Sequence, residues 1–265
     1  MYSKFQLIKK YIGYYLKASN GKGHGVHSPF VFDLITKVLN DDRQYYCYAN
    51  IEKLRRQLKK DHTLLTIEDF GAGSRVASHH QRKVSSIAQS SLKPAKFGQL
   101  FFRMVNYYQP RNIVELGTSL GITTAYMASA RPGATVVTME GAKQVASIAK
   151  NNFGVLGLTN IQVVEGNFDD TLPQVLQNIP FVDLAFVDGN HRKQPTLQYF
   201  KQLSDKANEN SIFIFDDIHW SEEMEEAWAA IKADERITLT IDLFFIGLVF
   251  FRPEQKIKQH FTVRF

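Results

Sequence analysis

The second half of the chain alternates between short apolar runs and amphipathic segments, and this alternation constrains the fold more than any other feature. The apolar runs predict strands near residues 112–116, 134–140, 161–165, 182–188 and 211–217. Helical periodicity fills the intervals, near residues 121–130, 142–153, 171–178, 194–205 and 221–234. Strand–helix alternation of this kind favours a doubly wound, mostly parallel α/β sheet.

The end of the chain departs from this pattern. Residues 237–243 and 245–252 are two apolar runs with almost no connector and no helix between them. Such a pair predicts an antiparallel hairpin that closes one edge of the sheet. The sequence therefore predicts a seven-stranded, mostly parallel sheet with a reversed C-terminal strand pair.

The N-terminal part has a different character, and we place a domain boundary between residues 95 and 96. Residues 1–95 are basic, and their sequence predicts a mainly helical extension that acts as a lid or a substrate-binding region. Residues 96–265 are predicted to form the α/β domain that binds the cofactor. In the first helix, near residues 4–17, Phe5, Ile8, Ile12 and Tyr15 recur at helical spacing. This stripe is consistent with packing on the rest of the protein or with lying on a membrane surface.

Composition limits the class of protein. Hydrophobic residues make up 44% and charged residues 22%, which is typical of a globular chain. The single cysteine, Cys47, excludes an intrachain disulfide and a metal site built on several thiolates. Neither an apolar run long enough to span a membrane nor a secretory signal is evident, so we expect a cytoplasmic protein. The oligomeric state cannot be predicted.

The net charge of +6 is unevenly distributed along the chain. Residues 1–110 carry 18 Lys/Arg and 7 Asp/Glu, whereas residues 111–265 carry 14 and 19. The basic part is consistent with solvated helix faces, or with a surface for an anionic partner such as nucleic acid, a phosphorylated sugar or membrane headgroups.

A glycine-rich turn follows the first predicted strand of the α/β part. Glu115 lies two residues before Gly117, and Gly121 follows after Thr118, Ser119 and Leu120. The glycines allow the backbone to approach a ligand, and the start of the next helix offers free N–H groups. The nearby acid suits a ligand with a positive centre. The spacing lacks the G-x-G-x-x-G triplet of dinucleotide-binding folds.

A second Gly-x-Gly, at Gly71 and Gly73, follows the apolar run at residues 64–67. Because strongly polar sequence comes next, we expect a loop or a short hairpin there, with the cofactor-binding turn as the alternative.

Acidic residues follow three more of the predicted strands. Glu140 lies 23 residues after Gly117, close to the spacing at which an acid binds ribose hydroxyls. Asp188 ends the fourth strand, and Asp216 and Asp217 end the fifth. Carboxylates brought together at one sheet edge repel unless a cation lies between them, which predicts a Mg²⁺ site.

These motifs, in this order, resemble those of class I methyltransferases that use S-adenosylmethionine, and in particular the catechol-type O-methyltransferases. The resemblance covers about residues 95–252. It implies cofactor contacts from residues at four successive strand ends. These residues are Glu115, Gly117, Thr118, Ser119, Gly121, Glu140, Gly166, Asn167, Phe168 and Asp188. The segment from Gly166 to Phe168 resembles the family's adenine-edge segment.

The resemblance also implies a magnesium ion that is held by Asp188, Asp216 and Asp217 and orients two acceptor oxygens. Catechol enzymes have a Lys just after the first metal ligand, whereas this chain offers His191. His191 and His219 are therefore the candidate catalytic bases, because histidine accepts protons near neutral pH.

The predicted function is O-methylation of a small hydroxylated acceptor with S-adenosylmethionine and Mg²⁺. A nucleic-acid methyltransferase that uses the basic N-terminal half is one alternative. The chain, however, lacks the Asn/Asp-Pro-Pro-aromatic turn of amino-methylating enzymes, and Cys47 lies outside the α/β part. A non-catalytic cofactor-binding protein is the other alternative.

Overall fold

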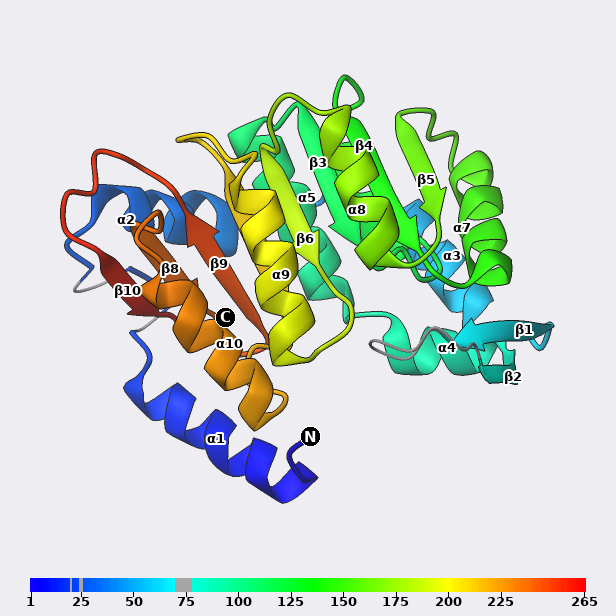
Figure 1. Cartoon of the computed structure of the whole chain (residues 1–265), viewed down its shortest axis with the longest axis horizontal. Helices are drawn as coiled ribbons and strands as arrows, with labels where there is room; N and C mark the ends of the chain where they lie inside the picture. Colours follow the sequence, from blue (N-terminus) through cyan, green and yellow to red (C-terminus); the bar gives the residue numbers. More distant parts are fainter. Residues whose placement is uncertain (20, 24–25, 70–77) are drawn as a thin grey trace. The chain divides into compact units, whose positions relative to one another are not determined.

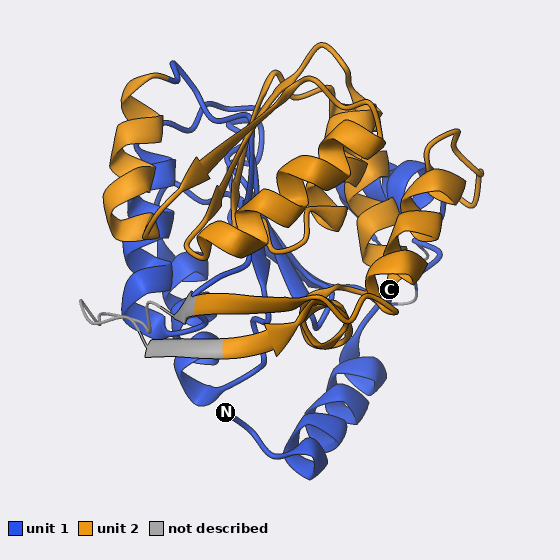
Figure 2. Cartoon of the chain, turned by 90° about the vertical axis from the view of Figure 1, so that its right-hand side faces the viewer, with its two compact units in different colours: residues 1–41, 179–265 blue, residues 42–178 orange. Residues whose placement is uncertain are grey.

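The computed structural model describes residues 1–19, 21–23, 26–69 and 78–265 (Figure 1). It divides into two compact units, one of residues 1–41 with 179–265 and one of residues 42–178 (Figure 2). This division differs from the boundary between residues 95 and 96, which stays a prediction.

The unit of residues 42–178 contains three parallel strands in the order β3-β4-β5. These are β3 (Asn112–Leu116), β4 (Thr135–Glu140) and β5 (Ile161–Glu165). Its helices are α3 (Tyr48–Leu58), α4 (Val84–Ser91), α5 (Ala95–Tyr108), α6 (Ile122–Ala130), α7 (Lys143–Val155) and α8 (Phe168–Gln177). Helices α6 and α8 pack on β4, and α7 packs on β4 and β5. Helices on the strands bury the sheet residues, and β3 is buried over four of its five positions.

The same unit carries a separate antiparallel hairpin of β1 (Leu64–Asp69) and β2 (Ser78–Lys83). This confirms the expectation of a loop or short hairpin in this stretch. Gly71 and Gly73 lie outside the described residues.

The unit of residues 1–41 and 179–265 contains five strands in the order β10-β8-β9-β7-β6. β6 (Leu184–Val187) and β7 (Ile212–Asp216) are parallel. β9 (Ile246–Phe250) pairs antiparallel with both β7 and β8 (Leu239–Asp242), which confirms the predicted reversed hairpin. Its helices are α1 (Lys4–Lys17), α2 (Pro29–Leu34), α9 (Lys193–Ser204) and α10 (Glu222–Ala233), with a π-helical turn, η1 (Ile35–Leu39), after α2.

One strand was not predicted. β10 (Gln259–Thr262) pairs parallel with β8. Apart from the hairpin of β1 and β2, the described residues therefore form eight strands, whereas the sequence predicts seven. The strand has only four residues, none of them fully buried, and polar sequence precedes it, so it gives no apolar signal. The predicted α/β fold class is otherwise confirmed.

Helix α1 begins where the sequence offers a cap and packs by an unexpected face. The Ser3 hydroxyl accepts from the N–H of Gln6, whose side chain accepts from the N–H of Ser3. Only Tyr14 is buried, in a cluster with Ala18 and Phe244. The predicted stripe of Phe5, Ile8, Ile12 and Tyr15 is exposed. The interpretation that this stripe packs on the protein is therefore wrong, because aromatic contacts and an ion pair hold the other face.

Among the described helices, none combines the length and the apolar character needed to cross a bilayer.

Candidate functional site

The turn after β3 surrounds a fully buried acid. Glu115 accepts hydrogen bonds from the hydroxyls of Thr124 and Thr138, the latter at 2.6 Å. Burial raises the pKa of Glu115 to about 7, although the two hydroxyls act in the opposite direction. Its second oxygen, Oε1, has no hydrogen-bond partner among the described residues. Such an oxygen at a glycine-rich turn can accept a hydrogen bond or pair with a positive group.

The backbone of this turn requires glycine. Gly117 and Gly121 have φ angles of 104° and 79°, in the left-handed region. A Cβ on Gly121 would lie 2.6 Å from Cε1 of Phe153. The N–H groups of Gly117 and Thr118 both donate to the carbonyl of Met139, which fixes the turn against the end of β4. The start of α6 therefore presents its free N–H groups at a defined position.

Glu140 ends β4 beside this turn. Its Oε2 accepts from the N–H of Ser119 at 2.9 Å, and its Oε1 accepts from the N–H of Ala142 at 3.0 Å. Burial raises the pKa of Glu140, and these backbone N–H groups partly offset the rise. The carboxylate is held in one orientation, and each oxygen keeps a lone pair for a diol.

The end of β5 adjoins Glu140. The N–H of Gly166 donates to the carbonyl of Glu140 at 2.9 Å, and Gly166 has a φ angle of 139°. The Asn167 side chain accepts from the N–H of Asp169 and caps α8, so that the helix begins at Phe168, three residues earlier than predicted. The predicted cofactor residues of this unit thus gather at the carboxyl ends of three adjacent strands.

The other unit holds a separate acidic group. Asp188 after β6, Asp216 at the end of β7, and His191 each place one ligand atom within 4.8 Å of the others. The Nε2 atom of His191 lies 3.5 Å from Oδ1 of Asp188. The structure thus brings two of the three predicted metal-binding aspartates together, with a histidine as the third member.

Asp217 is not part of this group. Its φ angle is 53°, and its N–H donates to the carbonyl of Phe245 at 2.7 Å. Asp217 thus lies in the turn after β7, and its carboxylate is not among the ligand atoms that lie within 4.8 Å of one another. Two consecutive acids in the sequence did not reveal which one would join the group.

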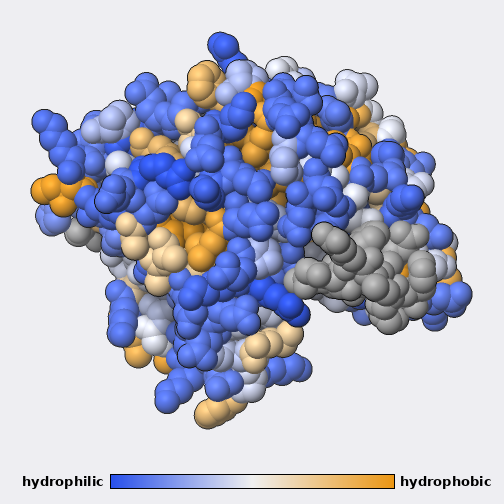
Figure 3. All heavy atoms as spheres, in the orientation of Figure 1, coloured by the Kyte–Doolittle hydropathy of each residue, from blue (hydrophilic) through white to orange (hydrophobic). Residues whose placement is uncertain are grey.

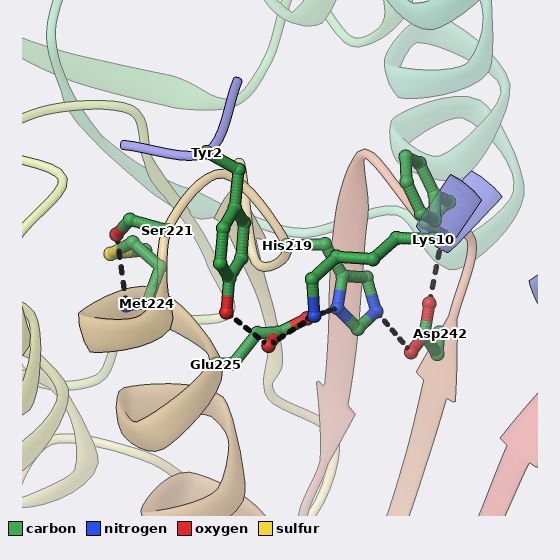
Figure 4. A network of polar contacts seen from close by, with 8 residues as sticks. Tyr2, Lys10, His219, Ser221, Met224, Glu225 and Asp242 are labelled. Carbon is green, nitrogen blue, oxygen red and sulfur yellow. Dashed lines mark hydrogen bonds and ion pairs between the residues drawn. The ribbon is translucent and has the colours of Figure 1, made fainter. Parts of the chain in front are cut away.

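His219 lies in a different polar network, between α10 and β8 (Figure 4). Its Nδ1 lies 2.9 Å from Oε1 of Glu225, and its Nε2 lies 2.8 Å from Oδ2 of Asp242. Glu225 also accepts from Lys10 and from the Tyr2 hydroxyl, both at 2.8 Å. The network therefore ties α1 to α10.

The network determines the charge of His219. Burial opposes protonation, but Asp242 and Glu225 outweigh it and the pKa of His219 is raised. Each ring nitrogen lies within hydrogen-bond distance of a carboxylate oxygen, and in the protonated form, in which both nitrogens donate, the ring has no lone pair to accept another proton. The role of His219 as a base stays a prediction that this arrangement does not favour. No local pattern in the sequence links it to Glu225 and Asp242.

An apolar pocket of about 420 Å³ lies next to the network. Its lining comes from α1, from the segment after β7 and from the β8–β9 turn. The lining residues are Leu7, Ile8, Tyr11, Asp217, His219, Trp220, Phe244 and Phe245. The ring of Phe244 stacks on His219, with a distance of 5.2 Å between centroids. The pocket has aromatic walls, one acid and one histidine, a lining suited to a small, largely apolar ligand. Sequence reasoning missed its aromatic residues, which come from three distant segments.

Comparison with known proteins finds similarity to methyltransferases. A model of the methyltransferase domain matches residues 114–218. A catechol O-methyltransferase of Niastella koreensis is 28% identical over 164 residues, covering 60% of this chain and 72% of that protein.

Two solved structures share the fold. The O-methyltransferase of Bacillus cereus, in complex with S-adenosylhomocysteine, is 19% identical with a TM-score of 0.54, covering 80% of this chain and 93% of that one. The S-adenosylhomocysteine-bound methyltransferase PaMTH1 of Podospora anserina is 14% identical with a TM-score of 0.59, covering 85% and 97%. Together with the glycine-rich turn and the strand-end acids, these findings show that the chain is similar to class I S-adenosylmethionine-dependent methyltransferases, and to catechol-type O-methyltransferases in particular.

Proposed function

We propose that the protein methylates a hydroxyl oxygen of a small acceptor with an apolar or aromatic body, assisted by a divalent cation. The observation that carries this proposal is the group of Asp188, His191 and Asp216, which belongs to the same unit as an aromatic pocket that includes Asp217. Such a pocket suits the body of an acceptor, and the acidic group suits a cation that acts on its hydroxyl.

The chain's residues fit the proposed cofactor. S-adenosylmethionine, when bound, supplies the methyl group on a positively charged sulfur. Glu140, held by two backbone N–H groups, would accept hydrogen bonds from the ribose hydroxyls. Glu115 would accept a hydrogen bond at its unpartnered oxygen, and Asn167 and Phe168 would border the adenine. Gly117 and Gly121 would let the backbone approach the ligand closely.

The donor set also fits a divalent cation. Two carboxylates suit Mg²⁺ or Mn²⁺, and an imidazole favours the transition metals, so the mixed set favours Mn²⁺ more than a set of three aspartates would. A bound cation supplies positive charge that lowers the pKa of a neighbouring hydroxyl. If Asp188 and Asp216 carry the cation, His191 is either its third ligand or the group that takes the hydroxyl proton.

The test is a methylation assay on a panel of catechols, phenols and sugars, with and without a chelator, followed by mass spectrometry. We expect turnover of the aromatic acceptors, loss of activity with the chelator, and recovery with Mg²⁺ or Mn²⁺. The double variant Asp188→Asn, Asp216→Asn should lose at least about a hundredfold in kcat/KM, as expected when a metal that activates the nucleophile is removed.

The matched control is the double variant Glu209→Gln, Glu235→Gln, which removes two exposed carboxylates from the same unit. It should retain activity. If turnover survives both the chelator and the Asp188/Asp216 substitutions, the cation has no role. If only sugars are methylated, the proposed acceptor class is wrong.

The comparisons affect the two alternative functions, a non-catalytic cofactor-binding protein and a nucleic-acid methyltransferase, in different ways. A non-catalytic protein does not agree with the match to methyltransferases. A nucleic-acid substrate has no specific observation in its favour, so we do not propose it.

A further inference from the structure

Helix α1 has two different apolar faces, and only one of them packs on the protein. On the inner face, Tyr14 is buried against Phe244, and its hydroxyl donates to the carbonyl of Val263. Lys10, next to this face, pairs with Glu225 at 2.8 Å. These contacts, drawn in part in Figure 4, fix which way the helix is turned.

The outer face is a continuous apolar strip, which we call the outer strip. It consists of Phe5, Ile8, Ile12 and Leu16, which are 78%, 58%, 53% and 75% exposed. At 3.6 residues per turn these four side chains fall within an arc of about 80°, roughly opposite Tyr14. Figure 3 shows hydrophobic side chains among hydrophilic ones at the lower edge, where α1 lies.

The charged side chains that border the outer strip are all positive. Lys4 and Lys9, both exposed, border the strip on its two sides. The first 32 residues contain five lysines and no Asp or Glu. Long lysine side chains at the border of an apolar strip can extend toward the headgroups of a bilayer while the strip enters it.

We propose that α1 binds the protein to the surface of an anionic bilayer, with the outer strip in the interface and the lysines at the headgroups. This inference concerns binding alone and does not depend on the proposed methyl transfer. Because Ile8 belongs both to the outer strip and to the apolar pocket, the bilayer would lie next to the pocket, and acceptors dissolved in lipid would lie close to it.

A second copy of the chain is a less suitable occupant of the outer strip. Two such helices packed face to face would bring the bordering lysines of both copies together. Helix α1 has no acidic residue with which to pair them. Like charges at a helix interface oppose association, whereas phosphate headgroups would neutralise them.

The test is flotation of the full chain with vesicles of phosphatidylglycerol and phosphatidylcholine, compared with vesicles of phosphatidylcholine alone. We expect binding to the anionic vesicles at low salt, weakened by added salt and much weaker to neutral vesicles. The double variant Phe5→Ser, Ile12→Ser should weaken binding at least about tenfold, because apolar insertion and charge act together. Lys4→Glu, Lys9→Glu should weaken it comparably.

The matched control is Phe181→Ser, Ile257→Ser, which replaces two equally exposed apolar side chains of the same unit outside α1. It should bind vesicles like the wild type. The proposal is overturned if the wild type does not float with anionic vesicles, or if the α1 variants float as well as the wild type. It is also overturned if sedimentation shows a dimer that the Phe5/Ile12 variant converts to monomer, because a second copy then covers the outer strip.

Discussion

Replacing Glu115 with glutamine should change how the protein's stability depends on pH. Glu115 is fully buried, and its pKa rises from 4.5 to about 7 on folding. As pH rises through this range, the unfolded chain loses a proton that the folded chain keeps, so the free energy of unfolding falls. The difference of about 2.5 pH units corresponds to a fall of about 3 kcal/mol, complete near pH 7 and absent below about pH 4.5.

Glutamine at this position has no proton to lose. Its carbonyl oxygen can still accept from the hydroxyls of Thr124 and Thr138, and its amide can occupy the place of the unpartnered oxygen. The cost of the substitution itself does not depend on pH. The stability of Glu115→Gln relative to the wild type should therefore improve by about 3 kcal/mol between pH 4.5 and pH 7.

The assay is urea unfolding followed by circular dichroism, without cofactor, at a series of pH values from 4.5 to 8. Glu209→Gln, which removes an exposed carboxylate, serves as the control and should follow the wild type. Parallel curves for Glu115→Gln and the wild type would mean that Glu115 is already ionised in the folded protein. The account of its burial would then be refuted.

Three further substitutions test the geometry of the two units. Gly121→Ala should lower the melting temperature, at a cost of about 1–3 kcal/mol, because its Cβ would meet Phe153 in a left-handed backbone; an unchanged melting temperature would contradict the packing. Glu140→Ala should weaken S-adenosylhomocysteine binding by about 1–3 kcal/mol in calorimetry if Glu140 binds ribose, and unchanged affinity would exclude that role. His219→Asn should remove a pH dependence, since the raised pKa of His219 gives stability that is present below about pH 6.5 and lost as pH rises through the folded pKa. The measurement is the hydrogen-exchange rate of the α1 amides against pH, in the wild type and in the His219→Asn variant, both of which keep Lys10. Equal pH profiles for the two proteins would refute this role of His219.

The α/β elements could be predicted because each carries its own pattern. The strand predicted at residues 161–165 and the helix predicted at 121–130 appear within one residue of those bounds. Buried strands are short apolar runs, and the helices between them repeat at 3.6 residues. The reversed pair of β8 and β9 was also visible, because no helix separates two apolar runs. β10 carried no such pattern, since it is short and only partly covered.

The candidate site could be predicted only where it follows from strand ends. Glu115 and Glu140 in one unit, and Asp188 in the other, were predicted because ligands bind at the carboxyl ends of parallel strands. The membership of His191, and the exclusion of Asp217, depend on side-chain direction at a turn, which a sequence does not show. The partners of His219 come from segments that meet only in the folded unit.

The central claim is that the turn between β3 and α6, with Glu140, binds the methyl donor. Calorimetric titration of the purified protein with S-adenosylhomocysteine tests it most directly, with divalent cation present and Gly121→Ala as a comparison. The account predicts one-to-one binding with a micromolar dissociation constant, and weaker binding by the variant. A well-folded wild-type sample that binds no S-adenosylhomocysteine would contradict the account.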